Sequence, residues 1–92
     1  MIKDFRHKGL ERLFIAGSKK GVQPKHVTRL RQILFRLHFA EKIEDMNFPG
    51  SDLHQLKGKL KGYYAVKVSG NWRIIFRFQG GHASEVDYDD YH

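Results

Sequence analysis

The stretch YYAVKVSGNWRIIFRF, residues 63–78, decides the fold because apolar side chains recur there at every second position. Such alternation is typical of β-strands that bury one face. It predicts strands over residues 63–68 and 72–78, and shorter runs predict further strands over residues 53–56 and 83–88. The C-terminal half is therefore expected to form a mainly antiparallel sheet.

The turn between the two central strands contains Gly70 and Asn71 and determines which side chains share a face. A strict two-residue loop would place the apolar residues of the two strands on opposite faces. A loop of three residues, 69–71, pairs Val68 with Trp72 and places them on one face, because a slip of one residue turns every side chain over. We therefore predict the three-residue loop.

This pairing predicts one apolar and one basic face of the sheet. The apolar face, which the helices should cover, carries Tyr64, Val66, Val68, Trp72, Ile74, Phe76 and Phe78. The opposite face carries Lys67, Arg73 and Arg77, with Lys67 opposite Arg73. Trp72 is therefore expected in the core.

The N-terminal half has the periodicity of amphipathic helices. One helix is predicted over residues 7–16 and ends at Gly17, and a second starts at Pro24 and continues to about residue 40. Residues 2–4 are a candidate short strand, and residues 41–52 form an irregular acidic connection. Together these elements predict an α+β fold, with two N-terminal helices packed on one face of a twisted, mainly antiparallel sheet.

The chain has 92 residues, which suffice for a single domain over residues 1–92 but not for two. It has no cysteine, so neither a disulfide nor a thiolate metal site is expected, which fits a reducing cytoplasm. No apolar run approaches the roughly 20 residues of a membrane span, and the N-terminal residues lack the apolar stretch of a secretory signal. We therefore expect a cytoplasmic protein with no membrane partner.

Charge is distributed unevenly along the chain, which has 17 Lys and Arg, 10 Asp and Glu and a net charge of +7. Residues 1–40 carry ten basic and two acidic residues (+8), and residues 54–78 carry six basic and no acidic residues (+6). Residues 41–53 (−3) and 79–92 (−4) are acidic. Such clustering predicts a polyanionic partner, with a merely solubilising surface charge as the alternative.

Basic and aromatic residues are interleaved over residues 53–78, a pattern suited to binding phosphates and stacking on unpaired bases. Tyr63 falls on the predicted basic face and is the better stacking candidate, with a structural role as the alternative. Lys57, Lys59 and Lys61 lie in a loop with two glycines. For Lys59 and Lys61, solvent exposure alone is the competing explanation.

The C-terminal segment EVDYDDYH, residues 85–92, combines acidic side chains with two tyrosines and a histidine. Alone it suggests a disordered end, but it follows a predicted strand, and its acids would be attracted to a basic surface beside it. Its carboxylates and His92 are metal-ligating types. Their spacing matches no known site, and the basic surroundings disfavour a cation, so no metal or other cofactor is expected.

Four segments together resemble the HigB branch of the RelE/ParE toxins, namely MIKDFRHKGLERLF, LHQLKG, VSGNWRIIFRF and the terminal VDYDDYH. The resemblance covers the chain from Met1 to His92. It implies a toxin of a type II toxin–antitoxin system that enters the A site of the 30S ribosomal subunit and cleaves messenger RNA without a metal. It also implies a bacterial source, a helix-turn-helix antitoxin of the HigA kind, and operator DNA bound only through the toxin–antitoxin complex.

In the implied reaction, the ribose 2′-OH attacks the adjacent phosphate and leaves a 2′,3′-cyclic phosphate and a 5′-OH. This requires a base, cations beside the phosphate, and an acid for the leaving oxygen. By resemblance, His54 and His92 are the acid/base pair, in an order left open, since imidazole titrates near neutral pH. Arg73 and Lys57 would hold the scissile phosphate.

Two further residues are carried over by resemblance. Tyr91 would position the nucleotide or stack on it, and Asp90 would orient an imidazole or read a base edge. The candidate RNA-binding residues outside this set are Lys59, Lys61, Tyr63, Lys67 and Arg77. The sequence departs from the family pattern at Gln55, where relatives often have proline, and at Ser69, where some are basic, which bears on codon preference.

Two other classes of function stay open. A toxin of the ParE branch inhibits DNA gyrase on the same scaffold without cleaving RNA, and it would not need the histidines and cations named above. A non-catalytic nucleic-acid-binding module would show salt-dependent binding without growth arrest. Independently, the exposed basic side of the predicted helix over residues 25–40 is a candidate dock for an acidic partner.

Overall fold

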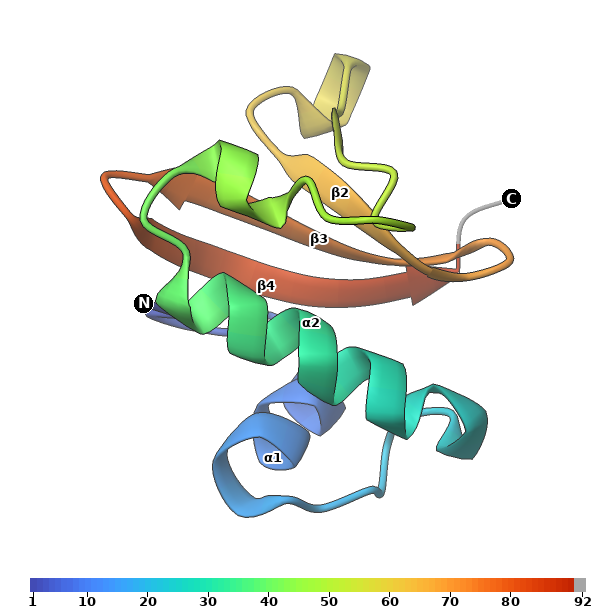
Figure 1. Cartoon of the computed structure of the whole chain (residues 1–92). Helices are drawn as coiled ribbons and strands as arrows, with labels where there is room; N and C mark the ends of the chain where they lie inside the picture. The colour runs from blue at the N-terminus through green and yellow to red at the C-terminus, as the bar shows by residue number, and fades with distance from the viewer. Residues whose placement is uncertain (91–92) are drawn as a thin grey trace.

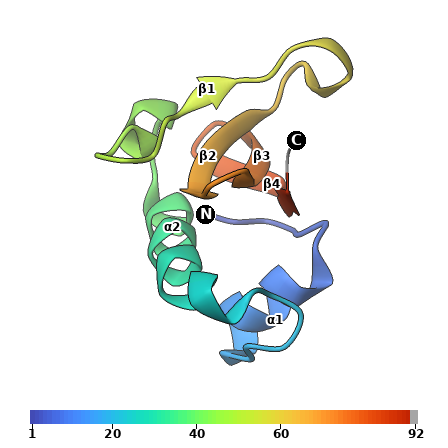
Figure 2. The same cartoon turned by 90° about the vertical axis from the view of Figure 1, so that its right-hand side faces the viewer.

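The computed structural model describes residues 1–90, and residues 91–92 lie outside the described part of the chain. Two α-helices precede a four-stranded antiparallel sheet with the order β1-β2-β3-β4 (Figures 1 and 2). In chain order the elements are α1 (Lys8–Ala16), the 3-10 helix η1 (Pro24–His26), α2 (Val27–Phe39), the 3-10 helix η2 (Ile43–Met46), β1 (His54–Gln55), the 3-10 helix η3 (Gly58–Leu60), β2 (Tyr64–Ser69), β3 (Trp72–Gln79) and β4 (His82–Asp90). The predicted α+β class is confirmed.

Local chemistry sets the ends of the helices. His7 precedes α1, and its Nδ1 accepts a 3.0 Å hydrogen bond from the backbone N–H of Leu10, which the first turn would otherwise leave unpaired. Gly17 ends α1 with a φ of 71°, a left-handed conformation that glycine adopts without steric cost. Pro24 opens η1, so the second helix begins as a 3-10 turn before it continues as α2. Across residues 1–90, no helix is long and apolar enough to cross a membrane.

Both helices pack on the same side of the sheet, as predicted (Figures 1 and 2). The α2 side chains that are 0% exposed are Leu30, Ile33, Leu34 and Leu37. The sheet side of the same core is formed by Val66, Val68, Ile74, Phe76, Ala83, Val86 and Tyr88. Removal of this apolar surface from water is the main force that holds the helices on the sheet.

The β2–β3 turn differs from the prediction, although the strand pairing beyond it does not. Ser69 pairs with Trp72, so the loop has two residues and the predicted three-residue loop is wrong. Lys67 nevertheless pairs with Arg73, as predicted, because Val68 is an extra residue in a β-bulge. The bulge supplies the one-residue shift that brings the apolar residues of both strands to one face.

The two edges of the sheet are less regular than predicted. Ile2 and Phe5 form isolated parallel bridges with Ala83 and Val86 of β4, so the N-terminal segment runs along that edge without becoming a full strand. β1 has two residues where a strand over residues 53–56 was predicted. Together with the loop that carries η3, β1 lies at the edge farthest from the helices (Figure 2).

Candidate functional site

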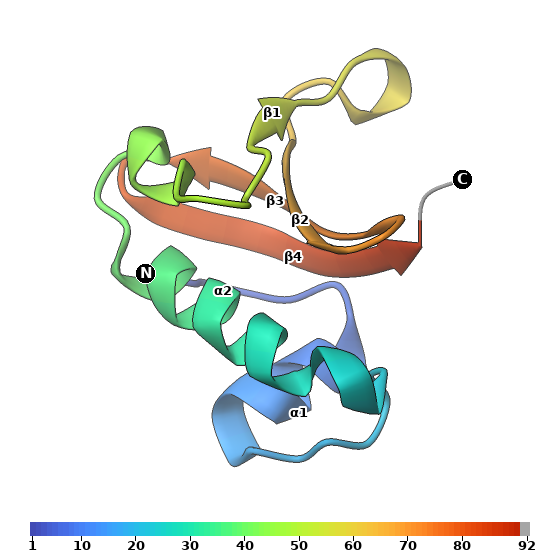
Figure 3. The ribbon, with the colours of Figure 1, turned by 45° about the vertical axis from the view of Figure 1, so that its right-hand side comes forward.

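A pocket of about 260 Å³ opens beside the β2–β3 turn. It is lined by Asp52, His54, Lys67, Gly70, Asn71, Trp72 and Arg73. Three residues selected from the sequence, His54, Lys67 and Arg73, therefore meet in one place. The tip of the β2–β3 hairpin also lies beside the C-terminal end of β4 (Figure 3).

Pairing of β1 with β2 fixes the backbone of His54, which lies opposite Ala65. The Nδ1 of His54 is 2.8 Å from the carbonyl oxygen of Asp52. Since a carbonyl oxygen can accept but not donate, Nδ1 of the neutral imidazole carries the proton, and the lone pair is on Nε2. The side chain is exposed, so Nε2 can take a proton from a bound substrate, or return one to it.

Arg73 lies on β3, and its side chain is 11% exposed. The pairing of β3 with β4 sets Asp89 opposite Arg73, and the Asp89 carboxylate is 3.9 Å from the Arg73 Nη2. In such a partly desolvated position, a guanidinium binds a phosphate more strongly than it does in bulk water. Asp89 was not selected from the sequence. Knowledge of the β3–β4 register, which places Asp89 opposite Arg73, would have identified it.

Lys57 lines a neighbouring pocket of about 390 Å³ instead of the pocket that contains His54. Lys61 lines this second pocket as well, and both lysines are exposed, as is Lys59 in η3. Lys67 is therefore the lysine that shares a pocket with His54. The lysines of the loop from β1 to β2 are not among the residues that line that pocket.

Tyr63 is 7% exposed, so its ring is not available as the predicted stacking surface. The Arg77 guanidinium lies over this ring at 4.3 Å, and the Tyr63 hydroxyl donates a 2.7 Å hydrogen bond to Glu85. Glu85 also forms ion pairs with Arg6 at 2.6 Å and with Arg77 at 3.0 Å. The hydrogen bond from Tyr63, followed by the charges of the two arginines, lowers the pKa of Glu85. Arg77 is thus engaged in an ion-pair cluster, which weakens the case for it as an RNA-binding residue.

One of the C-terminal candidates, Asp90, is the last residue of β4. Asp90 is half-buried and pairs with Trp72, which lines the pocket. Tyr91 and His92 lie outside the described residues. Within residues 1–90, no group of three or more His, Asp or Glu residues could hold a metal ion.

A family model described as the RelE-like toxin of the type II toxin–antitoxin system HigB matches residues 3–92. The chain belongs to the HigB-like toxin family. It is 42% identical over 92 residues to a protein named endoribonuclease HigB from Proteus vulgaris, and the match covers 100% of both chains. A chain of the solved YoeB–YefM complex from Staphylococcus aureus has a TM-score of 0.64 and 14% identity, covering 100% of this chain and 98% of that one. At so low an identity, this last likeness shows the fold alone.

A group of three aromatic rings, the half-buried Trp72 and the buried Tyr88 and His26, connects the pocket of this HigB-like toxin with its core. Trp72 stacks on Tyr88 with ring centroids 4.6 Å apart, and it meets the His26 ring edge-on at 5.5 Å. The Tyr88 hydroxyl and the His26 Nδ1 are 2.5 Å apart, and His26 is 2% exposed. The role of His26 was not identified from the sequence, because nothing near it in the chain indicates a partner 62 residues away.

The burial of His26 predicts a pH dependence of stability. Burial lowers the pKa of His26, and the charge of Lys25 lowers it further. In the unfolded chain the imidazole titrates at about 6.5, so below that pH the unfolded state takes up a proton that the folded state resists. We expect the free energy of unfolding to fall as the pH falls from about 7 to about 5, with at most about 1.4 kcal/mol per pH unit from this residue. Urea unfolding at both pH values should show a smaller loss in His26→Gln than in the wild type, and equal losses would contradict the assignment.

Proposed function

We propose that this HigB-like toxin is a metal-independent endoribonuclease that cleaves messenger RNA in the ribosomal A site. The observation that carries the proposal is the pocket in which the imidazole of His54 meets the cations Lys67 and Arg73. The name of the Proteus vulgaris relative, endoribonuclease HigB, supports the same class of reaction. A toxin that only occupied a protein surface would not need an imidazole with its reactive nitrogen exposed beside two cations.

In the proposed reaction, the ribose 2′-oxygen attacks phosphorus and loses its proton to a base. The bond from phosphorus to the 5′-oxygen then breaks, and an acid protonates that oxygen, which leaves a 2′,3′-cyclic phosphate and a 5′-OH. The Nε2 of His54, a residue with an exposed side chain, suits either transfer. His92 is proposed for the other transfer from the family resemblance, and it lies outside the described residues.

The extra negative charge on the reacting phosphate would be stabilised by Arg73 and Lys67. Lys57, Lys59 and Lys61 would bind the flanking RNA backbone through the loop between β1 and β2. Asp90 and Tyr91 are proposed to position the nucleotide and an imidazole. Asp90 is the last residue of β4 and pairs with Trp72 of the pocket, which supports its part in this proposal.

The partners follow from membership of a type II toxin family. Such a toxin has an antitoxin, and we propose a helix-turn-helix protein of the HigA kind that carries the complex to operator DNA. We also propose that the toxin acts in the bacterial cytoplasm, where its substrate, mRNA on ribosomes, is found.

Primer extension on a defined mRNA tests the proposed function. Purified toxin should cleave the mRNA when programmed ribosomes are present, with or without EDTA, and should leave the free mRNA intact. The His92→Ala variant should not cleave. If the wild type fails to cleave under every condition, the ribonuclease proposal is wrong, and inhibition of DNA gyrase becomes the next activity to assay.

A further inference from the structure

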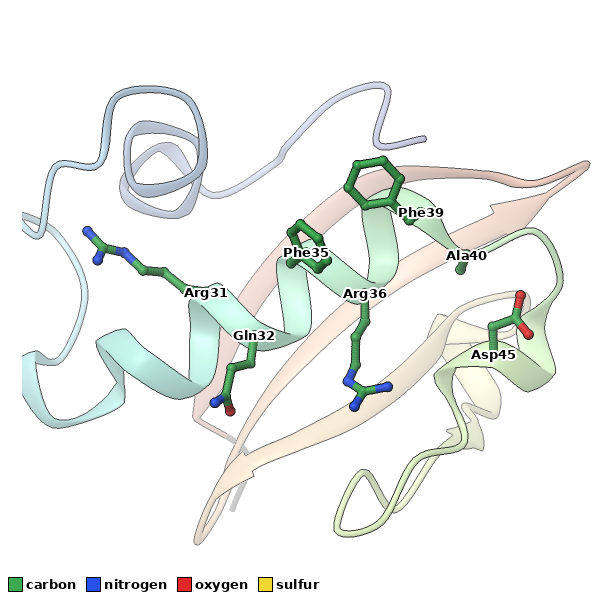
Figure 4. A pocket seen from close by; sticks show the side chains of 7 residues that line it. All are labelled: Arg31, Gln32, Phe35, Arg36, Phe39, Ala40 and Asp45. Atoms are coloured by element: carbon green, nitrogen blue, oxygen red, sulfur yellow. The ribbon is translucent and has the colours of Figure 1, made fainter.

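Helix α2 exposes two large apolar side chains on the face that points away from the core. Phe35 and Phe39 are each 65% exposed, and their ring centroids lie 4.9 Å apart. Around the two rings, a groove of about 700 Å³ is bounded by Arg31, Gln32, Arg36, Ala40 and Asp45. Figure 4 shows both rings on the same side of α2, with Arg31 and Arg36 extending from its flanks.

These rings are not required to hold α2 on the sheet. The helix already buries Leu30, Ile33, Leu34 and Leu37 completely on its inner face. A helix with one apolar face toward the core normally keeps its outer face polar. A paired aromatic patch on the outer face therefore indicates a surface that another molecule covers.

The charges around the groove indicate an acidic occupant. The sequence of α2, VTRLRQILFRLHF, contains three arginines and no acidic residue. The single carboxylate of the groove, Asp45, accepts hydrogen bonds from the backbone N–H groups of Glu41 and Lys42 at 2.9 and 3.2 Å, so it is already engaged. Arg31 and Arg36 are exposed and therefore present most of the charge that an approaching partner meets.

We propose that this groove, Phe35 and Phe39 with their flanking arginines, binds an amphipathic helix of the antitoxin. Apolar side chains of that helix would cover the two rings, and acidic side chains would lie beside Arg31 and Arg36. A second copy of the toxin is disfavoured, because a twofold pairing of this surface would bring Arg31 and Arg36 of both copies together. The inference rests on the chain being a type II toxin and is independent of its ribonuclease activity.

The groove and the pocket of His54 are separate surfaces. The groove belongs to α2 and η2, whereas the pocket belongs to the segment around β1 and to the β2–β3 hairpin, and the two share no lining residue. An antitoxin helix in the groove would therefore leave the His54 pocket uncovered. An antitoxin bound at the groove alone would inhibit the toxin because the complex is larger than the free toxin, and not because it fills the His54 pocket.

Isothermal titration calorimetry with the separately purified cognate antitoxin tests the proposal. Phe35→Ala/Phe39→Ala should weaken binding by about 30-fold or more, the effect of removing a central interface residue. Arg31→Glu/Arg36→Glu should weaken it as well and reduce the dependence of the dissociation constant on salt. Ile15→Ala is the matched control, because Ile15 is 72% exposed on α1 outside the groove, and it should bind like the wild type.

Three results would overturn the proposal. The first is unchanged antitoxin affinity in the phenylalanine variant. The second is a wild-type dimer, found by light scattering, that this variant dissociates, since the occupant would then be a second copy. The third is a phenylalanine variant that binds the antitoxin with unchanged affinity but no longer cleaves mRNA on ribosomes. Circular dichroism should be used to check that each variant is folded. The titration remains informative even if the wild type does not cleave RNA.

Discussion

Replacement of Arg73 by alanine is expected to slow ribosome-dependent mRNA cleavage by about 10²–10³-fold, the usual cost of removing one group that stabilises developing charge. The Arg73 side chain is 11% exposed, so its charge acts on the phosphate with little screening by water. Lys67 lies opposite Arg73 on β2 and would remain, but a single ammonium cannot reproduce the planar fork of a guanidinium. Cleavage rates measured with saturating toxin on programmed ribosomes give the change directly.

The matched control for Arg73→Ala is Arg77→Ala. Both arginines lie on β3, four residues apart, but Arg77 is engaged by Glu85 and by the ring of Tyr63. We expect Arg77→Ala to change the cleavage rate by less than about 10-fold, because an exposed ion pair contributes little and the pocket is left intact. Urea unfolding shows whether either variant is destabilised. Equal losses of activity in the two variants would mean that Arg73 has no special role at the phosphate.

The sheet shows why a sequence pattern predicts faces better than turns. Alternation of apolar residues required Val66 and Ile74 to share a face, and the structure has that pairing. Two backbone solutions satisfy the requirement, a three-residue loop or a two-residue loop with a bulge. The structure uses the bulge at Val68, and no side-chain property distinguishes the two in advance. The register beyond the turn was therefore predictable, whereas the predicted pairing of Val68 with Trp72 and the geometry of the turn were wrong.

The ion-pair cluster around Glu85 shows the limit of the same reasoning for function. Arg6, Tyr63, Arg77 and Glu85 come from distant parts of the chain, and their contacts depend on an irregularity in the β3–β4 pairing. Glu85 has a φ of 52° there, a left-handed conformation that cannot be predicted from a glutamate in the sequence. Alternation along the strand placed Arg77 on the basic face and made it a candidate RNA-binding residue. Its neutralisation could be seen only after the strands were placed in space.

Lys67 and Arg73 are the opposite case. Their common face follows from the alternation of the strands, and the pocket contains both of them. The histidine beside them could not be placed by alternation, because β1 is too short to show a period. Its selection came from the family resemblance, and the structure adds the contact with Asp52 that places the proton of the neutral imidazole on Nδ1 and the lone pair on Nε2.

Replacement of His54 by alanine is expected to lower the rate of cleavage by about 10²–10⁴-fold, the range found when a general acid or base is removed. The physical reason is that alanine has no group that can transfer a proton. In the wild type, the Asp52 carbonyl holds the proton of the neutral imidazole on Nδ1 and leaves Nε2 for proton transfer. His82→Ala is the matched control, because His82 is exposed at the start of β4 and lines neither pocket beside β1. The His82→Ala variant should cleave mRNA at the rate of the wild type.

The pH profile of the His54→Ala variant then separates the two chemical roles. A base must be unprotonated to act, so its loss removes the limb on which the rate rises with pH. An acid must be protonated, so its loss removes the limb on which the rate falls as the pH rises. Either change, measured by single-turnover cleavage on ribosomes, assigns His54 to one proton transfer and leaves the other to a different group. An unaltered profile with an unaltered rate would exclude His54 from both transfers, and the tautomer set by Asp52 would then be a structural feature without a part in cleavage.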